Sequence, residues 1–323
     1  MVFMSSLREV GESHLTKRAK ERGSQRAGQR RNGVGGVLYQ HRWDYFFILP
    51  KVLFFAAFVL IPVLWAFLLS FQEVRPFGSV WVGLDNFQRA WHDPLLVTAL
   101  TNTIKYTVVT VPASLILALV LATLVHPLGA RPQSFFRGAF YLPRVTSIVV
   151  IAMVWRWIYQ PRYGLLNYFL GLFGVAGPDW LGNANVALWA LILMFILTPP
   201  GLGVILYLSA MNAIPEELYE AARIDGASAW RQWYKITLPL LKPATLYLII
   251  LETIGAFQAF AQIEMMTKGG PGNATTTLVY LIYQTAFRDF DFGLASAQAI
   301  LLFAIIFLVA FFQYRFLTSK VQY

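Results

Sequence analysis

The sequence predicts an all-α membrane protein with six transmembrane helices, and three observations support this fold class. Of its 323 residues, 57% are hydrophobic and only 13% are charged, whereas soluble domains carry nearer a quarter charged residues. Several apolar stretches reach about twenty residues, the length that crosses a bilayer as a helix. The basic residues are divided unevenly between the two sides. We expect spans at Tyr45–Phe71, Thr101–Val125, Gly138–Tyr159, Val186–Ala210, Ala244–Met266 and Leu294–Phe316.

The distribution of basic residues predicts the orientation of these spans. Of the 26 Lys and Arg residues, seventeen lie in the N-terminal arm, in the loops after the second and fourth spans and at the C-terminal end, where Arg315 and Lys320 are counted. The other three loops hold five. Because cytoplasmic loops are enriched in Lys and Arg, both termini and the loop 211–243 are predicted to be cytoplasmic. The net charge of +10 is then explained mostly by this orientation, and the basic residues can also interact with anionic membrane lipid. We expect no nucleic-acid partner.

The chain divides into three predicted parts. Residues 1–43 are basic and rich in Gly, Ser and Gln, which is typical of a disordered cytoplasmic arm, and they lack the apolar region of a signal peptide. Residues 44–317 form the six-span domain, and residues 318–323 form a cytoplasmic tail. The sequence has no cysteine and its four histidines are not spaced as metal ligands. We therefore expect no metal, cofactor or thiol chemistry in this chain.

The loop 211–243 combines signals for two short helices separated by a turn. Pro215 and the two glutamates that follow it suit the first turn of a helix, where the helix dipole favours anions. Gly226 is placed to end that helix with a positive φ. Ser228 can cap a second helix, which Leu238–Pro239 is expected to stop. The sequence therefore predicts cytoplasmic coupling helices between the fourth and fifth spans.

Seven positions of this loop follow a fixed pattern: Glu220-Ala221-Ala222, three residues, Gly226, nine residues, then Ile236-x-Leu238-Pro239. The pattern resembles the EAA loop of binding-protein-dependent ABC importer permeases, which docks onto a separate ATPase. The resemblance implies that Glu220 makes a charge-assisted contact with the ATPase, that Gly226 forms the turn, and that the paired alanines allow close approach. The implied coupling residues are Glu220, Ala221, Ala222, Asp225, Gly226, Ile236, Leu238 and Pro239.

The resemblance also implies partners and a cargo class. Ile224-Asp225-Gly226-Ala227 is typical of carbohydrate importers, and the likeness runs from about Phe46 to Phe316, closest to the first of the two permeases in maltose-type systems. It implies a multi-pass protein of the bacterial or archaeal plasma membrane that works with a second permease subunit, two ABC ATPase subunits and an external solute-binding protein. ATP and Mg would bind to the ATPases, so this chain would not itself be an enzyme. The implied cargo is a di- or oligosaccharide, with glycerol 3-phosphate or another small polar solute as the alternative.

Polar residues of the fourth and fifth spans are candidates for a solute path. A carboxylate inside a span costs on the order of 3 kcal/mol, so Glu252 is expected to face either a water-filled path or a partner subunit. Gly255, Ala259 and Gln262 are spaced to share one helical face with it. The segment Thr198–Gly201, with two prolines, is predicted to break the fourth span, as an opening for substrate or as a packing kink. The candidate path is Phe195, Thr198, Pro199, Glu252, Ala259 and Gln262, and its carboxylate would weigh against a phosphorylated solute.

The last outer loop carries a Gly-Gly-Pro turn and three threonines, which is similar to the last outer loop of these permeases. We expect the solute-binding protein to dock there, at Gly269, Gly270, Pro271 and Phe287, and on the outer loop Gln160–Asn185. Arg144 is placed near the cytoplasmic end of the third span. Three rival functions stay open: an importer of amino acids, peptides or ions, an intramembrane lipid-modifying enzyme, and a channel. The enzyme would need a cluster of Asp, His or Cys at the membrane face, and the channel would leave the loop 211–243 unexplained.

Overall fold

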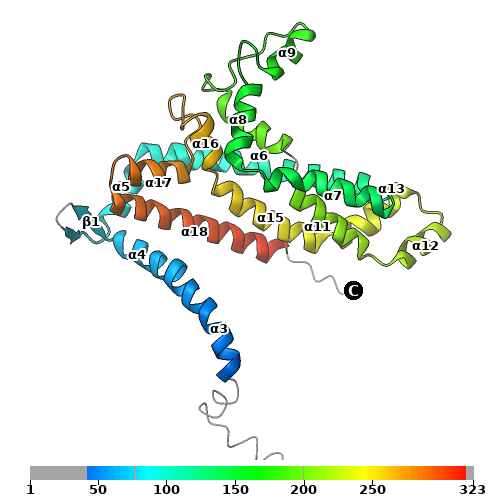
Figure 1. Ribbon diagram of the computed structural model, residues 1–323, viewed down its shortest axis with the longest axis horizontal. Coiled ribbons are helices and arrows are strands. Elements are labelled where there is room, and N and C mark those ends of the chain that lie inside the picture. Colours follow the sequence, from blue (N-terminus) through cyan, green and yellow to red (C-terminus); the bar gives the residue numbers. More distant parts are fainter. Residues whose placement is uncertain (1–41, 76–77, 199, 318–323) are drawn as a thin grey trace, which may run out of the picture. The chain divides into compact units, whose positions relative to one another are not determined.

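The computed structural model describes residues 42–75, 78–198 and 200–317 of the chain (Figure 1). Residues 1–41 of the predicted arm 1–43, the predicted tail 318–323 and Pro199 therefore lie outside the described residues. The chain divides into two units, and their described parts begin at residue 42 and at residue 66.

The described part of the first unit is helical. Helix α3 (Arg42–Phe55) continues through a π-helical turn η1 (Ala56–Leu60) into α4 (Ile61–Leu69). The prediction of a first span is confirmed as an apolar helix long enough to cross a membrane. The π turn has a local cause, because the ring of Pro62 would clash with a carbonyl in a regular α-helix. The wider turn moves that carbonyl, and the N–H of Ile61 bonds to the oxygen of Ala56, five residues back.

The second unit is a helical bundle with one small antiparallel hairpin, in which Gln72 pairs with Trp81. Its elements in chain order are β1 (Gln72–Arg75), β2 (Gly78–Trp81), α5 (Asp85–His92), α6 (Pro94–Val125), α7 (Ala130–Val145), α8 (Ile148–Ile158), α9 (Leu165–Leu172), α10 (Ala187–Leu197), α11 (Gly201–Asn212), α12 (Glu216–Ile224), α13 (Ala229–Gln232), the π-helical η2 (Trp233–Thr237), α14 (Leu238–Leu240), α15 (Lys242–Phe257), α16 (Ala261–Met266), α17 (Leu278–Phe287) and α18 (Phe292–Leu317).

Helix α6 is the centre of this bundle, and α10, α11, α15 and α17 pack around it. It begins where the side chain of Asp93 accepts a bond from the N–H of Leu95 and Pro94 takes the first helical position. Small residues let neighbouring helices come close. A Cβ added to Gly203 of α11 would lie 2.9 Å from the Cβ of Ala118 in α6. Packing of this kind holds helices together in lipid, where the hydrophobic effect between helices is weak.

The predicted second and sixth spans are confirmed as the continuous apolar helices α6 and α18. The third, fourth and fifth regions are bent pairs: α7 with α8 at 92°, α10 with α11 at 41°, and the helix 229–240 with α15 at 61°. The described residues thus hold three helices that could cross a membrane, or up to six if each bent pair counts as one span.

Two predicted spans are wrong as single helices. The third breaks between α7 and α8, because Thr146 is extended and the side chain of Ser147 accepts a bond from the N–H of Val149, which starts a new helix. The fifth ends at Phe257 and resumes as α16. There the carbonyl of Ala259 leaves the helical ladder and accepts a hydrogen bond of 2.8 Å from the hydroxyl of Thr277. The predicted single helical face from Glu252 through Ala259 to Gln262 is therefore broken.

Candidate functional site

Helix α6 contacts two loops that the sequence analysis identified, one near each of its ends. Near its start, the amide nitrogen of Asn102 donates to the carbonyls of Asn273 and Thr276, both at 3.0 Å. Near its end, the hydroxyl of Thr123 accepts from the indole of Trp233 at 3.2 Å. At 1.5 Å per residue, Asn102 and Thr123 are about 31 Å apart, close to the thickness of a bilayer core. The loops 267–277 and 211–243 are thus fixed at opposite ends of one membrane-length helix (Figure 1).

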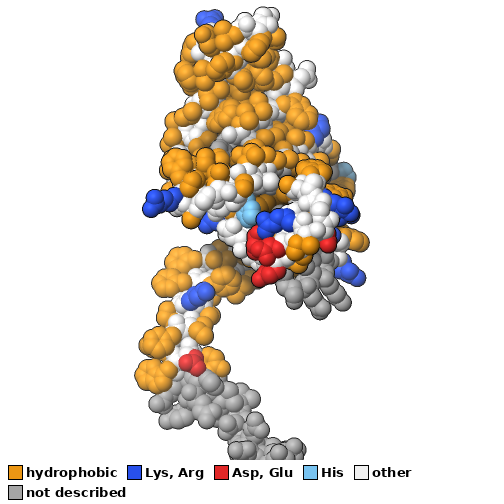
Figure 2. Space-filling view, turned by 90° about the vertical axis from the view of Figure 1, so that its right-hand side faces the viewer, with side chains coloured by type: hydrophobic (Ala, Val, Ile, Leu, Met, Phe, Trp, Pro, Cys, Tyr) orange, Lys and Arg blue, Asp and Glu red, His pale blue; other side chains and the backbone are white. Residues whose placement is uncertain are grey.

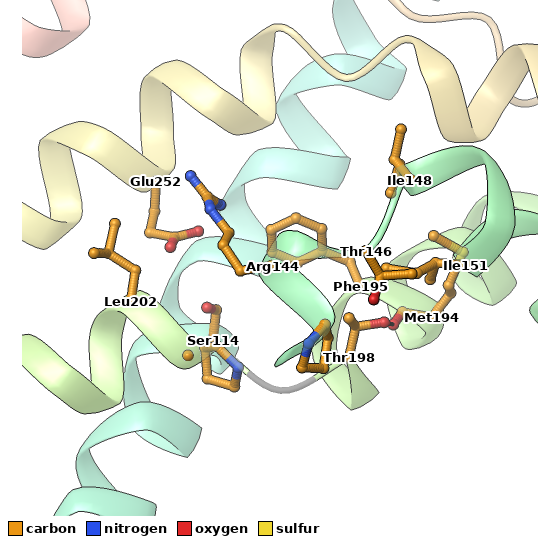
Figure 3. A pocket seen from close by; sticks show the side chains of 13 residues that line it. Ser114, Arg144, Thr146, Ile148, Ile151, Met194, Phe195, Thr198, Leu202 and Glu252 are labelled. Atoms are coloured by element: carbon orange, nitrogen blue, oxygen red, sulfur yellow. Dashed lines mark hydrogen bonds between the residues drawn. The ribbon is translucent and has the colours of Figure 1, made fainter. Parts of the chain in front are cut away.

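A pocket of about 320 Å³ opens beside the middle of α6. Ser114, which lines it, lies about 18 Å along the helix from Asn102 and about 14 Å from Thr123. Figure 3 shows side chains from several helices converging on this space. The lining residues are Ser114, Pro143, Arg144, Thr146, Ile148, Ile151, Met194, Phe195, Thr198, Pro200, Gly201, Leu202 and Glu252.

Two opposite charges project into this pocket. The guanidinium of Arg144 comes from the end of α7 and the carboxylate of Glu252 from the middle of α15, and they lie on the same side of the pocket (Figure 3). Arg144 is exposed and Glu252 is half-buried. Together with hydroxyl groups and the ring of Phe195, they give the pocket hydrogen-bond donors, acceptors and an aromatic face.

The pocket forms where two helices are interrupted. Helix α7 ends at Val145 and α8 starts at Ile148, while α10 ends at Leu197 and α11 starts at Gly201. The glycine is required for this arrangement, because a Cβ at Gly201 would overlap the backbone of Phe140 in α7. The break predicted at Thr198–Gly201 is confirmed. Interrupted helices near the middle of a membrane expose backbone groups, and transporters commonly bind solutes there.

The structure brings together only part of the predicted solute path. Phe195, Thr198 and Glu252 line the pocket. Ala259 is buried beside Thr277, and the buried amide of Gln262 bonds to the hydroxyl of Tyr106 at 3.3 Å, so neither lines the pocket. Their absence from it follows from the break at the end of α15.

Sequence reasoning missed Arg144 and Ser114 as pocket residues. Arg144 interrupts an apolar stretch, and that signal could have marked it, since charged residues within spans tend to face cavities. The assumption of one straight third span instead placed it near a membrane surface. For Ser114, inside a long apolar helix, the sequence holds no comparable signal.

The loop 211–243 has the predicted shape. Helix α12 follows Pro215, Gly226 has a φ of +72°, and the hydroxyl of Ser228 accepts from the N–H of Arg231 at 3.4 Å to start α13. The hydroxyls of Tyr219 and Thr237, 2.8 Å apart, hold α12 against η2. The prediction of helix, glycine turn and helix is confirmed.

The tip of this loop is open to a partner. Glu220, Ala221, Asp225 and Gly226 are exposed and Ala222 is half-buried. The side chain of Ile224 is 87% exposed, an unusual state for an isoleucine. Figure 2 views the molecule from this end, where acidic and basic side chains gather beside apolar surface.

The end of the second helix was predicted to within one residue. The helix passes through Leu238–Pro239 and ends at Leu240, where the chain bends by 61° into α15. The π turn η2 precedes the proline, and the N–H of Leu238 bonds to the oxygen of Trp233, five residues back. This is the arrangement found before Pro62 in the first unit, and it relieves the same clash. Ile236, Leu238 and Pro239 are half-buried, and Leu238 and Pro239 lie in the last turn of this helix.

The loop 267–277 is a tightly bonded turn. Gly269 has a φ of +78° and is buried, and a Cβ there would lie 2.6 Å from the hydroxyl of Thr276. That hydroxyl donates to the carbonyl of Gly269, and the hydroxyl of Thr275 donates to the carbonyl of Gly270. Of the four residues predicted to dock the binding protein, Gly269 is buried, Gly270 and Pro271 are half-buried, and Phe287 is 62% exposed.

Among the residues that the model describes, no three His, Asp or Glu side chains group as metal ligands. The chemistry of the pocket is therefore that of hydrogen bonds, one aromatic ring and two opposite charges.

Comparisons with known proteins bear on the family and the fold. Residues 112–323 match the family described as binding-protein-dependent transport system inner membrane component. The chain is 32% identical over 292 residues to the sn-glycerol-3-phosphate transport system permease protein UgpA of Escherichia coli (strain UTI89 / UPEC), covering 88% of this chain and 98% of that protein. UgpA of Salmonella typhimurium gives the same identity and coverage.

Among solved structures, a bacterial ABC transporter involved in the import of the acidic polysaccharide alginate is 21% identical, with a TM-score of 0.79, over 90% of this chain and 99% of that one. The same transporter type in complex with an alginate pentasaccharide-bound periplasmic protein gives a TM-score of 0.76 at 21% identity, over 86% and 94% of the two chains. At this identity the likeness establishes the fold alone.

Proposed function

This chain belongs to the family of binding-protein-dependent transport system inner membrane components, and from that membership we propose that it carries a small polyhydroxylated solute through the pocket between α6, α7, α10 and α15. As a member of this family it is a membrane permease component of a binding-protein-dependent ABC importer. The observation that carries the proposal is the position of the pocket, midway along a membrane-length helix and at two helix breaks.

The proposed topology has six spans and cytoplasmic termini, with residues 44–317 as one transmembrane domain. The spacing along α6 supports it, since the loops 211–243 and 267–277 are separated by about the thickness of a bilayer core. The absence of native cysteine makes a direct test simple. In intact cells, a membrane-impermeant thiol reagent should label Asn273→Cys and spare Ala221→Cys. Labelling in the reverse pattern would refute the orientation.

The proposed coupling site is the exposed tip of the loop 211–243. A second permease, two ATPases that bind ATP and Mg, and an external solute-binding protein complete the proposed importer in a bacterial or archaeal plasma membrane. Glu220 would pair with a basic group of the ATPase, and Ala221 and Ala222 would allow its backbone to approach. Closure of the ATPases would then move α12 as a rigid lever and rock the helices around the pocket. The binding protein would dock on the opposite side, where Phe287 and the rim of the turn 267–277 are exposed.

The proposed cargo is a sugar or glycerol 3-phosphate. Hydroxyl groups of either solute can donate to Glu252 and accept from Arg144, and a sugar ring can pack on Phe195. The sequence argument that Glu252 weighs against a phosphorylated solute loses force, because Arg144 shares the pocket and offsets the charge. A guanidinium is well suited to bind phosphate. The similarity to permeases of sn-glycerol-3-phosphate transport systems supports this cargo as a candidate.

The test is transport by the reconstituted importer with its own binding protein. Uptake of labelled maltose and of labelled glycerol 3-phosphate is measured with the wild type and with Arg144→Gln. A phosphorylated cargo predicts a loss of roughly tenfold or more in the variant, because a charge-assisted bond is removed. A neutral sugar predicts a smaller loss. Uptake that is unchanged by Arg144→Gln and by Glu252→Gln would remove the pocket from the solute path.

A further inference from the structure

A second cavity lies away from the proposed solute path, between the segment that leads out of the loop 211–243 and the end of α18. It has a volume of about 680 Å³. We call it the basic groove and define it by its two lysines and its apolar wall. The residues used below are Tyr234, Lys235, Lys242, Leu246, Ile249 and Phe316.

The mouth of the groove is positively charged. Lys235 of η2 and Lys242, the first residue of α15, are both exposed, and the ammonium of Lys235 lies 5.6 Å from the centre of the Tyr234 ring. None of the described residues that line the groove is acidic. The ion pairs found within the described ranges 42–75, 78–198 and 200–317 join Arg75 to Glu73, Arg89 to Asp291, Arg223 to Glu216 and Arg288 to Glu264, and so leave both lysines free to meet an anion.

The wall behind the lysines is apolar and runs inward. Leu246 and Ile249 follow Lys242 along α15, so Ile249 lies about 10 Å deeper than the lysine. Phe316, near the end of α18, covers the other side and is 76% exposed. This arrangement matches a phospholipid. The charged mouth can bind the headgroup, and the apolar wall is long enough to pack along part of an acyl chain.

The depth of the groove also fits a lipid headgroup. Lys242 lies ten residues before Glu252 of the mid-depth pocket, which is about 15 Å along α15. That is half the thickness of a hydrocarbon core, so the ammonium groups stand at the height of the phosphate layer. Basic pockets between helices on the cytoplasmic side are known to take anionic headgroups.

We propose that the basic groove binds one anionic phospholipid of the cytoplasmic leaflet, with its phosphate between Lys235 and Lys242 and an acyl chain along Leu246 and Ile249. The choice of leaflet rests on the proposed topology, whereas binding itself does not require that this chain transports any particular solute.

The test is native mass spectrometry of the delipidated importer complex, titrated with dioleoyl phosphatidylglycerol or dioleoyl phosphatidylcholine. We expect one tightly bound phosphatidylglycerol per copy of this chain, and no tight binding of phosphatidylcholine. Lys235→Gln with Lys242→Gln should weaken that binding about twenty-fivefold, from about fivefold for each lysine. The matched control is Lys51→Gln with Arg131→Gln, which removes two basic charges from exposed positions outside the groove and should leave tight binding unchanged.

Leu246→Trp tests the acyl wall while both lysines remain. It should also abolish tight phosphatidylglycerol binding, with the assembly of the complex checked by size-exclusion chromatography. If the double variant and its control lost phosphatidylglycerol affinity equally, the binding would be unspecific electrostatic attraction and the proposal would be overturned. If inorganic phosphate displaced phosphatidylglycerol completely, and Leu246→Trp still bound this lipid tightly, the groove would be a simple anion site and the proposal would be overturned. A wild-type complex without tight phosphatidylglycerol binding would overturn the proposal equally. None of these outcomes depends on transport, so failure here is distinguishable from failure of the proposed function.

Discussion

The loop 211–243 is specified by residues close together in the sequence, whereas the mid-depth pocket is specified by residues far apart in it. The loop is built by neighbours in sequence: a proline and glutamates start α12, Gly226 turns the chain, and Ser228 starts α13. The pocket gathers residues from positions 114 to 252, held by a glycine contact between α7 and α11. The comparison teaches that a docking loop can be encoded locally, whereas a solute pocket depends on how several helices break and pack.

The largest expected effect is at the glycine turn of the loop. Gly226→Val places a β-branched residue at a φ of +72°, although no atom within 4 Å would oppose its Cβ. The strain should therefore act through the backbone and reorient α12, with a cost of about 2 kcal/mol or more. We expect solute-stimulated ATP hydrolysis and uptake to fall by roughly thirtyfold.

Gly226→Asn is the matched control for the turn, because asparagine tolerates positive φ. It should keep most of the wild-type uptake. Equal loss in both variants would mean that the absence of a side chain, and not the turn geometry, is what the partner requires.

Next in size is the carboxylate of the pocket. Glu252→Gln should lower uptake about tenfold, because the amide cannot replace a charge-assisted bond to a hydroxyl group. Gln262→Leu is the comparison, at a predicted position that does not line the pocket. It should lower thermal stability, through the lost bond to Tyr106, while leaving the KM for uptake unchanged. A raised KM for uptake in Gln262→Leu would show that Gln262 does contribute to the solute path.

The packing that shapes the pocket gives a third test. Gly201→Ala should destabilise the protein by about 1–3 kcal/mol, because the added Cβ meets the backbone of Phe140. Gly255→Ala in α15, where nothing lies within 4 Å of an added Cβ, should instead be neutral or stabilise by about 0.5–1 kcal/mol. Unfolding in detergent, followed by circular dichroism, measures both. Similar effects of the two variants would contradict the close contact of α7 and α11.

The break at the end of α15 should have a similar or smaller cost. Thr277→Val removes the hydroxyl that donates to the buried carbonyl of Ala259 and that also accepts from the N–H of Tyr280 at the start of α17, so we expect a loss of about 2 kcal/mol. Thr98→Val, whose hydroxyl is exposed and bonds within its own helix, is the control and should change stability less. The same unfolding assay applies, and equal losses would argue that the break does not depend on this bond.

The smallest effect concerns pH at the loop end of α6. Burial lowers the pKa of His126, and the charge of Glu216 opposes that shift. Because the folded state binds this proton less readily, stability should fall as the pH drops below the ordinary histidine pKa of about 6.5. His126→Gln should lose less stability than the wild type between pH 7.5 and 5.5. An unchanged pH dependence would contradict this contribution.

The sequence allowed much of the fold to be predicted, but not its interruptions. Long apolar runs predicted α6 and α18, and the pair of prolines predicted the break before Gly201. The break at Thr146–Ser147 has only a weak local signal, since Pro143 lies inside α7 and an ordinary serine starts α8. The break after Phe257 depends on Thr277, eighteen residues away from Ala259, so no local pattern could indicate it.

The same distinction explains the outcome for the pocket. Phe195, Thr198 and Glu252 were found because polar or broken positions inside apolar runs are conspicuous. Ala259 and Gln262 were included only through an assumed straight helix. Arg144 was missed for the converse reason, because a bend that the sequence does not announce brings it from an assumed membrane surface into the pocket.

The most direct test of the central claim uses the absence of native cysteine. Thr198→Cys is introduced into the reconstituted importer, and its reaction with a small hydrophilic methanethiosulfonate is followed with and without cargo-loaded binding protein and ATP. The account predicts that Thr198→Cys reacts and that the transported solute slows the reaction, while the buried Ala259→Cys stays unreactive. A Thr198→Cys that is unreactive, or that reacts equally with and without a solute that is being transported, would contradict the assignment of this pocket to the solute path.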